Sequence, residues 1–154
     1  MRVPAYADFT YLNDPAKRER VERDGLISVG DVGYLEDGHL YLCDRRSDMV
    51  ISAGTNIYPA EIENALVQCP GVQDCAVFGI PDEEFGESLA AAVEPVPGAE
   101  ISPDSIREFL GQKIARFKIP KRIDFHDALP RHDSGKIFKR KLREPFWQAS
   151  GRSI

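Results

Sequence analysis

Cysteine is scarce in this sequence, and its spacing fits no common disulfide or metal framework. The sequence contains three cysteines, an odd number without a C-x-x-C pair: Cys43, Cys69 and Cys75. Both features argue against a set of disulfide bonds and against a zinc site, and they fit a reducing compartment. The histidines lie far apart without ligand spacing, at positions 39, 126 and 132. We therefore predict no metal site.

Long apolar runs and a signal-peptide pattern are also missing. No segment approaches the roughly 18 continuous apolar residues expected of a membrane span, and the N-terminus does not have the composition of a signal peptide. We therefore predict a cytoplasmic protein without a transmembrane segment.

An excess of positive charge is absent as well. The net charge is -5, and the basic residues gather near the end of the chain. This balance argues against nucleic acid or an anionic membrane as a partner, although it is compatible with a local anion site. A hydrophobic content of 42% and a charged content of 29% are ordinary for a globular protein. Function must therefore be read from local motifs.

The length of 154 residues corresponds to one domain, or to one domain and a piece of another. Residues 1–5 resemble an internal stretch that follows a start codon more than the beginning of a folded unit. Truncation is therefore a hypothesis that the sequence raises.

Apolar periodicity predicts a mixture of helices and strands. Helices are predicted at 16–24, from 59 to 69 and from 103 to 119, the last with a core face formed by Ile106, Phe109, Leu110, Ile114 and Phe117. A hairpin is predicted within 26–43, turning at Asp37-Gly38. Further strands are predicted at 49–51, 75–80, 89–93 and 123–125, with loops at 52–56, at 81–87 and from 130 into a basic tail. The pattern predicts a compact α+β domain from about Asp48 onward.

Three stretches hold residues suited to chemistry: 28–35, 43–63 and 129–140. In the first, Asp31 follows Gly30, and its carboxylate offers two acceptor oxygens that suit the hydroxyls of a ribose. An ordinary Asp-Gly turn is the alternative. The third stretch contains Lys136 in a Pro-x-x-x-x-Gly-Lys pattern.

Together, these stretches resemble the signature of the adenylate-forming superfamily, which includes acyl-CoA synthetases, firefly-type luciferases and the adenylation domains of peptide synthetases. The resemblance covers about residues 5–147. It implies an α+β fold, in which a short antiparallel or mixed sheet is flanked by helices and preceded by a β-hairpin. It also implies a division into the end of a large domain (1–46), a hinge (47–48), the small C-terminal domain (49–150) and a tail (151–154).

The resemblance implies that Asp31 and Arg45 bind the nucleotide through its ribose. A surface ion pair is the alternative for Arg45. The family places its hinge two residues after this arginine, usually at Asp or Lys. The present sequence departs from that pattern with Ser47, and Asp48 is the adjacent candidate. A hinge needs conformational tolerance more than a given side chain.

The resemblance also implies that Ala53 and Gly54 face the pantetheine arm of CoA, where a Cβ at Gly54 would narrow the passage. A turn glycine with positive φ is the compatible alternative. Lys136 is the implied catalytic residue, with Gly135 and Glu61 in support. An ammonium at that point can contact both the carboxylate and the α-phosphate of ATP as charge shifts between them. The alternative is one lysine among many on a solvated basic tail.

The implied substrates are a carboxylic acid, ATP and CoA, with Mg²⁺ bound mainly by a large N-terminal domain, which is the implied partner. Residues 56–63 look more like acyl-CoA synthetases than peptide synthetases. We therefore expect the C-terminal part of an acyl-CoA synthetase, inactive alone. The alternatives are a peptide synthetase or luciferase-like branch, and a non-catalytic interaction module of the same fold.

Overall fold

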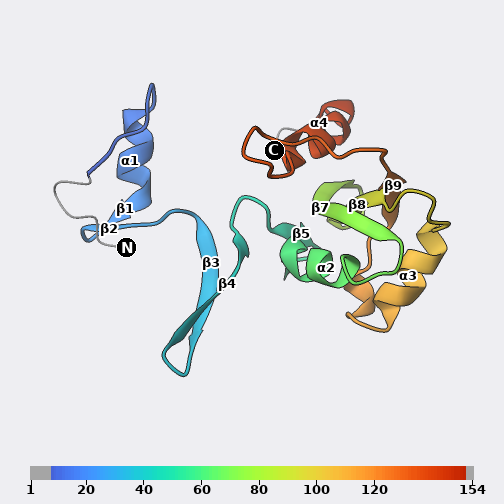
Figure 1. Ribbon diagram of the computed structural model, residues 1–154. Helices are drawn as coiled ribbons and strands as arrows, with labels where there is room; N and C mark the ends of the chain where they lie inside the picture. Colours follow the sequence, from blue (N-terminus) through green and yellow to red (C-terminus); the bar gives the residue numbers. More distant parts are fainter. Residues whose placement is uncertain (1–7, 152–154) are drawn as a thin grey trace. The chain divides into compact units, whose positions relative to one another are not determined.

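The computed structural model describes residues 8–151, which divide into two compact units (Figure 1). The first unit ends at Arg46 and the second begins at Ser47. The stretch 1–5 that resembles an internal segment lies outside the described residues, as does the predicted tail after residue 151.

The first unit combines a short helix with two hairpins. Its elements are α1 (Pro15–Val21), β1 (Glu22–Arg23), β2 (Leu26–Ile27), β3 (Asp31–Glu36) and β4 (His39–Arg45). Helix α1 begins where the Asp14 carboxylate accepts a hydrogen bond from the backbone N–H of Lys17 at 3.0 Å. The helix ends earlier than predicted because Asp24 and Gly25, both with positive φ, form the turn between β1 and β2. Gly25, which directly follows the predicted helix, is therefore a hairpin residue.

The predicted hairpin within 26–43 is confirmed by β3 and β4. The two strands pair antiparallel from Asp31 opposite Arg45 to Glu36 opposite His39. At the tip, Asp37 has a φ of 49° and Gly38 a φ of 78°, as a two-residue type I′ turn requires.

The second unit is a sheet covered by helices on both faces. Its elements are β5 (Val50–Ser52), β6 (Thr55–Ile57), α2 (Pro59–Leu66), β7 (Val72–Asp82), β8 (Gly86–Pro95), α3 (Pro103–Gly111), the 3₁₀ helix η2 (Arg116–Lys118), β9 (Arg122–Phe125) and α4 (Lys139–Ala149). Strands β7 and β8 pair antiparallel along their length. The other edge of β8 pairs with β5 at one end and with β9 in parallel, and β6 continues the sheet beyond β5. The sheet is therefore mixed, as expected.

Alternate residues of β7 and β8 belong to two different cores. On one face, Val77 and Val93 pack with Ile62, Leu66 and other side chains of α2 and α3. On the other face, residues from the same strands pack against α4 and the segment before it: Ala76, Phe78, Ala90, Ala92, Leu129 and Leu142. Figure 1 shows α4, in red, on the side of the sheet away from α2 and α3. Because both faces are covered, the middle parts of the two strands, 75–80 and 89–93, are unbroken apolar runs.

Two sequence predictions in this unit are wrong. Helix α3 starts as predicted, with a capping box between Ser102 and Ser105, but it ends at Gly111. Phe117 therefore lies in η2 with 60% of its surface exposed, and it is not a core residue. The segment after Pro130 also contains a helix, α4, which the sequence pattern did not reveal because nearly half of its residues are charged and Pro145 lies inside it. Among residues 8–151, no helix is long and apolar enough to cross a membrane.

Candidate functional site

The candidate catalytic lysine lies on a short hairpin, residues 130–138, which we call the lysine hairpin. Arg131 and Ile137 form an antiparallel bridge, and the backbone N–H of Phe138 donates to the carbonyl of Pro130 at 2.7 Å. At the tip, the N–H of His132 donates to the carbonyl of Lys136 at 2.9 Å. Gly135 has a φ of 83°, which favours glycine. The backbone on both sides of Lys136 is thus held by hydrogen bonds.

Lys136 differs from every other lysine of the chain. Its side chain is exposed, and its ammonium forms no hydrogen bond or ion pair with the described residues. Three other lysines pair with carboxylates: Lys118 with Glu61, Lys121 with Asp82 and Lys139 with Glu63. The remaining three lie over aromatic rings: Lys17 over Tyr11, Lys113 over Phe109 and Lys141 over Phe138. Among the lysines, Lys136 alone has an ammonium without a carboxylate or aromatic partner in the part of the chain that the structure describes.

Glu61, predicted as a supporting residue, forms an ion pair with a residue of another element. Both of its carboxylate oxygens lie 2.7 Å from the ammonium of Lys118 on η2. No hydrogen bond or ion pair joins Glu61 to Lys136 in the structure. Glu61 therefore ties α2 to η2, and any support that it gives to Lys136 is indirect.

Asp31 and Arg45 are brought together at one end of the first hairpin. The two residues are direct cross-strand neighbours, and Nε of Arg45 lies 3.6 Å from Oδ1 of Asp31. The Arg45 side chain is two-thirds exposed, so this ion pair contributes little to stability. The backbone at this point is shaped by glycines, since Gly30 has a φ of 85° and a Cβ at Gly33 would overlap the carbonyl oxygen of Tyr41. The arrangement leaves a carboxylate and a guanidinium side by side and accessible.

Ala53 and Gly54 form a hairpin turn, not the open loop that we predicted. They connect β5 to β6, with φ values of 49° and 76°. The N–H of Ala53 donates to the carbonyl of Phe85 at 3.0 Å, which fixes the turn against the end of the β7–β8 pair. Glycine suits this position because the turn requires a positive φ. A Cβ built on Gly54 would meet no atom within 4 Å, so the space in front of the residue is open.

The predicted hinge residues contact the C-terminal helix. Nη1 of Arg143, on α4, donates to the carbonyl of Ser47 at 3.3 Å and lies 4.0 Å from the carboxylate of Asp48. Arg143 is half-buried, and its Nε has no hydrogen-bond partner within the described chain. The first residues of the second unit are therefore held by the element that was missed in the sequence.

The cysteines are free thiols without the environment of a nucleophile. Burial raises the pKa of the Cys75 thiol to about 12, and it also raises the pKa of Cys69. Both therefore stay protonated at neutral pH. Within residues 8–151, no three or more His, Cys, Asp or Glu side chains cluster as metal ligands would.

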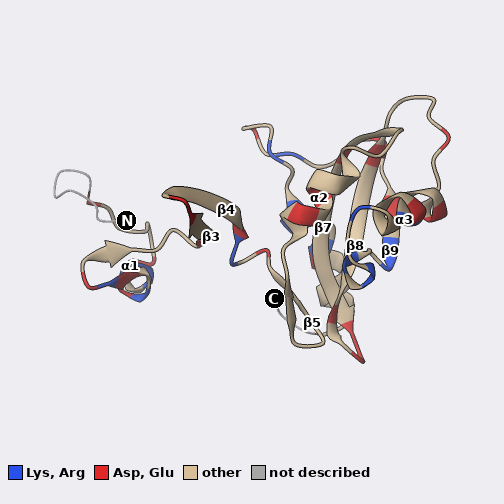
Figure 2. Ribbon diagram, turned by 90° about the horizontal axis from the view of Figure 1, so that it is seen from below, with Lys and Arg blue, Asp and Glu red and all other residues tan. Residues whose placement is uncertain are grey.

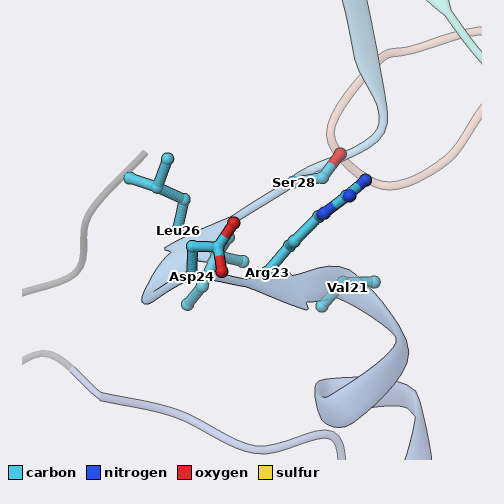
Figure 3. Close-up of a pocket in the computed structure, with 6 residues that line it drawn as sticks. Val21, Arg23, Asp24, Leu26 and Ser28 are labelled. Atoms are coloured by element: carbon cyan, nitrogen blue, oxygen red, sulfur yellow. The ribbon is translucent and has the colours of Figure 1, made fainter.

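A hollow of about 300 Å³ lies beside the first small hairpin (Figure 3). Its lining comes from residues near β1 and β2: Val21, Arg23, Asp24, Leu26, Ile27 and Ser28. Since none of the predicted site residues lines it, we assign it no role.

The fold and the lysine hairpin together define a class of domain. Residues 61–136 match the model of the AMP-binding enzyme C-terminal domain. The chain belongs to the AMP-binding enzyme family, as its sequence motifs indicated.

Curated relatives and solved structures give the same assignment. The chain is 45% identical over 145 residues to a fatty acid–[acyl-carrier-protein] ligase, ScoC of Streptomyces coeruleorubidus, covering 94% of this chain and 28% of the relative. It is 44% identical over 137 residues to the long-chain-fatty-acid–CoA ligase FadD13 of Mycobacterium tuberculosis, covering 88% of this chain and 27% of the relative. The ATP-bound structure of MatB from Rhodopseudomonas palustris superposes with a TM-score of 0.82 at 37% identity. The match covers 89% of this chain and 28% of the MatB chain. The chain thus spans between a quarter and a third of the length of these relatives, and the predicted α+β fold is confirmed.

Several residues around the lysine hairpin were not identified from the sequence. Arg131 contacts Asp74, Glu94 and the carbonyl of Gly135. The Asp74 carboxylate raises the pKa of the Arg131 guanidinium, because the two side chains share a hydrogen bond. Asp74 and Glu94 become neighbours only through the pairing of β7 with β8, so no local pattern marks them. Arg131 itself lies within the Gly-Lys motif, and its position there was the one available signal.

Proposed function

We propose that this chain is the C-terminal lobe of an ATP-dependent acid–thiol ligase and that Lys136 is the residue it supplies to acyl-adenylate formation. The observation that carries the proposal is the exposed ammonium of Lys136, which has no partner among the described residues, on a hairpin whose Arg131 is held by carboxylates of the sheet. In this reaction, a carboxylate oxygen attacks the α-phosphorus of ATP, and the bond to pyrophosphate breaks. Both reacting groups are anions, so a positioned cation lowers the barrier.

In the second half of the reaction, the thiol of the acceptor attacks the acyl carbon of acyl-AMP. The products are a thioester and AMP, and the thiol proton is released. We propose that the turn at Ala53-Gly54 lies along the path of this thiol, because the space in front of Gly54 is open. The relatives named above are one CoA ligase and one acyl-carrier-protein ligase, and CoA is the acceptor that we propose.

The proposed partner is a large N-terminal domain that binds ATP with Mg²⁺ and the carboxylic acid. The β3–β4 hairpin supports this because apolar side chains that a folded protein would cover lie exposed on it: Tyr34, Leu35, Leu40, Tyr41 and Leu42. Asp31 and Arg45, at the end of the same hairpin, would bind the ribose of the nucleotide.

We propose that Ser47 and Asp48 form the hinge about which the second unit turns between the two half-reactions. The boundary between the two compact units falls immediately before Ser47, which supports this position. Rotation there would present Lys136 in the first step and the Gly54 turn in the second, a form of gating by domain rearrangement. The free thiols also fit a reducing compartment such as the cytoplasm.

The proposal is tested in a chimera in which this chain replaces the matching 27% of the FadD13 ligase. We expect Lys136→Ala to slow acyl-AMP formation by about a hundredfold or more, because one lost transition-state contact costs on the order of 3 kcal/mol. Thioester formation from supplied acyl-AMP should keep its rate, because Lys136 acts only in the first step.

The matched control is Lys141→Ala, which removes an exposed lysine on the adjoining helix. It should leave both half-reactions unchanged. An active chimera in which Lys136→Ala also left acyl-AMP formation unchanged would contradict the proposed role. A chimera that folds but stays inactive would favour an interaction module.

A further inference from the structure

Arg131 joins the lysine hairpin to the sheet through ion pairs, beside the apolar packing of Ile137 against the core. Its Nη2 lies 2.6 Å from Oδ2 of Asp74 on β7 and 3.8 Å from Oε2 of Glu94 on β8. Its Nη1 donates to the carbonyl of Gly135 at 3.1 Å. The guanidinium therefore reaches from two strands of the sheet to the peptide group that precedes Lys136.

The two carboxylates that hold Arg131 are themselves fixed. Asp74 and Glu94 are direct partners in the pairing of β7 with β8, and like charges in such positions repel one another unless a cation lies between them. Oδ1 of Asp74 accepts the N–H of Cys75 at 2.8 Å. Glu94 is almost fully buried and accepts from Gln73 and from the N–H of Leu129, each at 2.9 Å. Arg131 is thus bound by two carboxylates that other hydrogen bonds hold in place.

The contact of Arg131 with Gly135 bears directly on Lys136. The Gly135 carbonyl belongs to the peptide group that ends at the Lys136 Cα, so its orientation influences the direction in which the lysine side chain leaves the hairpin. Gly135 has positive φ and no neighbour within 4 Å of a built Cβ, so nearby side-chain packing does not restrain it. A planar guanidinium can hold a carboxylate and a carbonyl at the same time, which an ammonium does less well.

We propose that Arg131 is a positioning residue for acyl-adenylate formation, which fastens the peptide before Lys136 to Asp74 and Glu94 and thereby aims the Lys136 ammonium. This inference rests on the proposed function of Lys136. Arg131 itself touches no reacting atom, and its effect passes through Lys136.

The test uses the same chimera and measures both half-reactions for Arg131→Met and Arg131→Lys. We expect both variants to slow acyl-AMP formation by about ten- to a hundredfold, because a misplacement of about 1 Å can cost that much. Thioester formation from supplied acyl-AMP should be unchanged. Arg131→Lys keeps a positive charge beside Asp74 and Glu94, so it should unfold at the same urea concentration as the wild type. A loss of rate in this variant would therefore report on the position of Lys136 and not on a loss of folding.

The decisive measurement is the double variant. In a Lys136→Ala background, Arg131→Met should cause no further loss of acyl-AMP formation, because the residue acts through the missing lysine. The matched control is Arg107→Met on α3, where the guanidinium also joins a carboxylate, Asp104, to a carbonyl, that of Lys121. This control should leave both half-reactions unchanged.

Three results would overturn the inference: an unchanged rate in both Arg131 variants, an equal loss in both half-reactions, or an equal loss with and without Lys136. If Lys136→Ala itself had no effect, the proposed function would fail first. The two failures are therefore distinguishable.

Discussion

At the scale of single residues, three lysines of the second unit are paired with carboxylates, whereas Lys136 has no partner among the described residues. Lys118, Lys121 and Lys139 are each 2.7 to 2.9 Å from a carboxylate, whereas Lys136 is exposed. A hydrated ammonium costs nothing while it is exposed, and it gains in strength when water is excluded around two anions. The pairing of its neighbours also keeps them from competing for the same anions.

Asp82 provides a test of residue-scale electrostatics that is independent of catalysis. The turn between β7 and β8 is acidic (Figure 2). The carboxylate of Asp82, the last residue of β7, lies 2.9 Å from the Lys121 ammonium and accepts the N–H groups of Phe85 and Glu84. The hydrogen bond from Lys121, together with those N–H groups, lowers the pKa of Asp82 from 3.8 to about 2. A lowered folded-state pKa gives stability that is present above about pH 4 and lost as the pH falls toward 2.

We therefore expect Asp82→Asn to reduce the unfolding free energy near neutral pH and to flatten its fall between about pH 4 and 2. Urea titrations of the chain at a series of pH values measure this slope. Glu83→Gln, which alters an exposed carboxylate of the same turn, should keep the wild-type slope. An unchanged slope in Asp82→Asn would show that the Lys121 contact is not maintained in solution.

At the scale of elements, turns with positive φ determine where strands end. The β3–β4 and β5–β6 hairpins both turn through two consecutive residues with positive φ, Asp37-Gly38 and Ala53-Gly54. Any Cβ meets the following carbonyl in this conformation, but aspartate and asparagine tolerate it better than alanine because their short polar side chains can form local hydrogen bonds. Ala53 is therefore a locally strained residue, held in place by its hydrogen bond to Phe85.

We expect Ala53→Asn to raise the unfolding free energy of the chain by about 1 kcal/mol, since the left-handed conformation costs alanine roughly that amount. Ala53→Val, with a branched Cβ, should lower the free energy at the same site. Urea denaturation monitored through Trp147, whose indole donates to the carbonyl of Gly79 on β7, reports on this unit. A lower unfolding free energy in Ala53→Asn would contradict the claim that Ala53 is strained.

The same elements show how far the sequence could predict the fold. Strands β7 and β8 and the start of α2 were predicted because buried apolar runs and an N-terminal proline are local signals. Helix α4 was missed because its tertiary contacts, through Leu142 and Phe146, stabilise a segment whose own composition is charged. Lys136 could be found from its motif. The contacts of Arg131 with Asp74 and Glu94 depend on strand register, which no local pattern specifies.

At the scale of the whole molecule, the residues that we propose to act in the reaction are divided between two separate units. Asp31 and Arg45 belong to the first unit, and Lys136 and Gly54 belong to the second. The exposed apolar face of the β3–β4 hairpin supports a further domain as its cover. Under the proposed function, activity therefore belongs to the assembly of this chain with a large domain.

The most direct test of this account is ATP–pyrophosphate exchange after the chain is mixed with the remaining large portion of the FadD13 ligase. We predict no exchange by either piece alone, exchange by the mixture, and about a hundredfold less exchange when the added chain carries Lys136→Ala. Robust exchange by the chain alone, or equal exchange with wild-type and Lys136→Ala chains, would contradict the account.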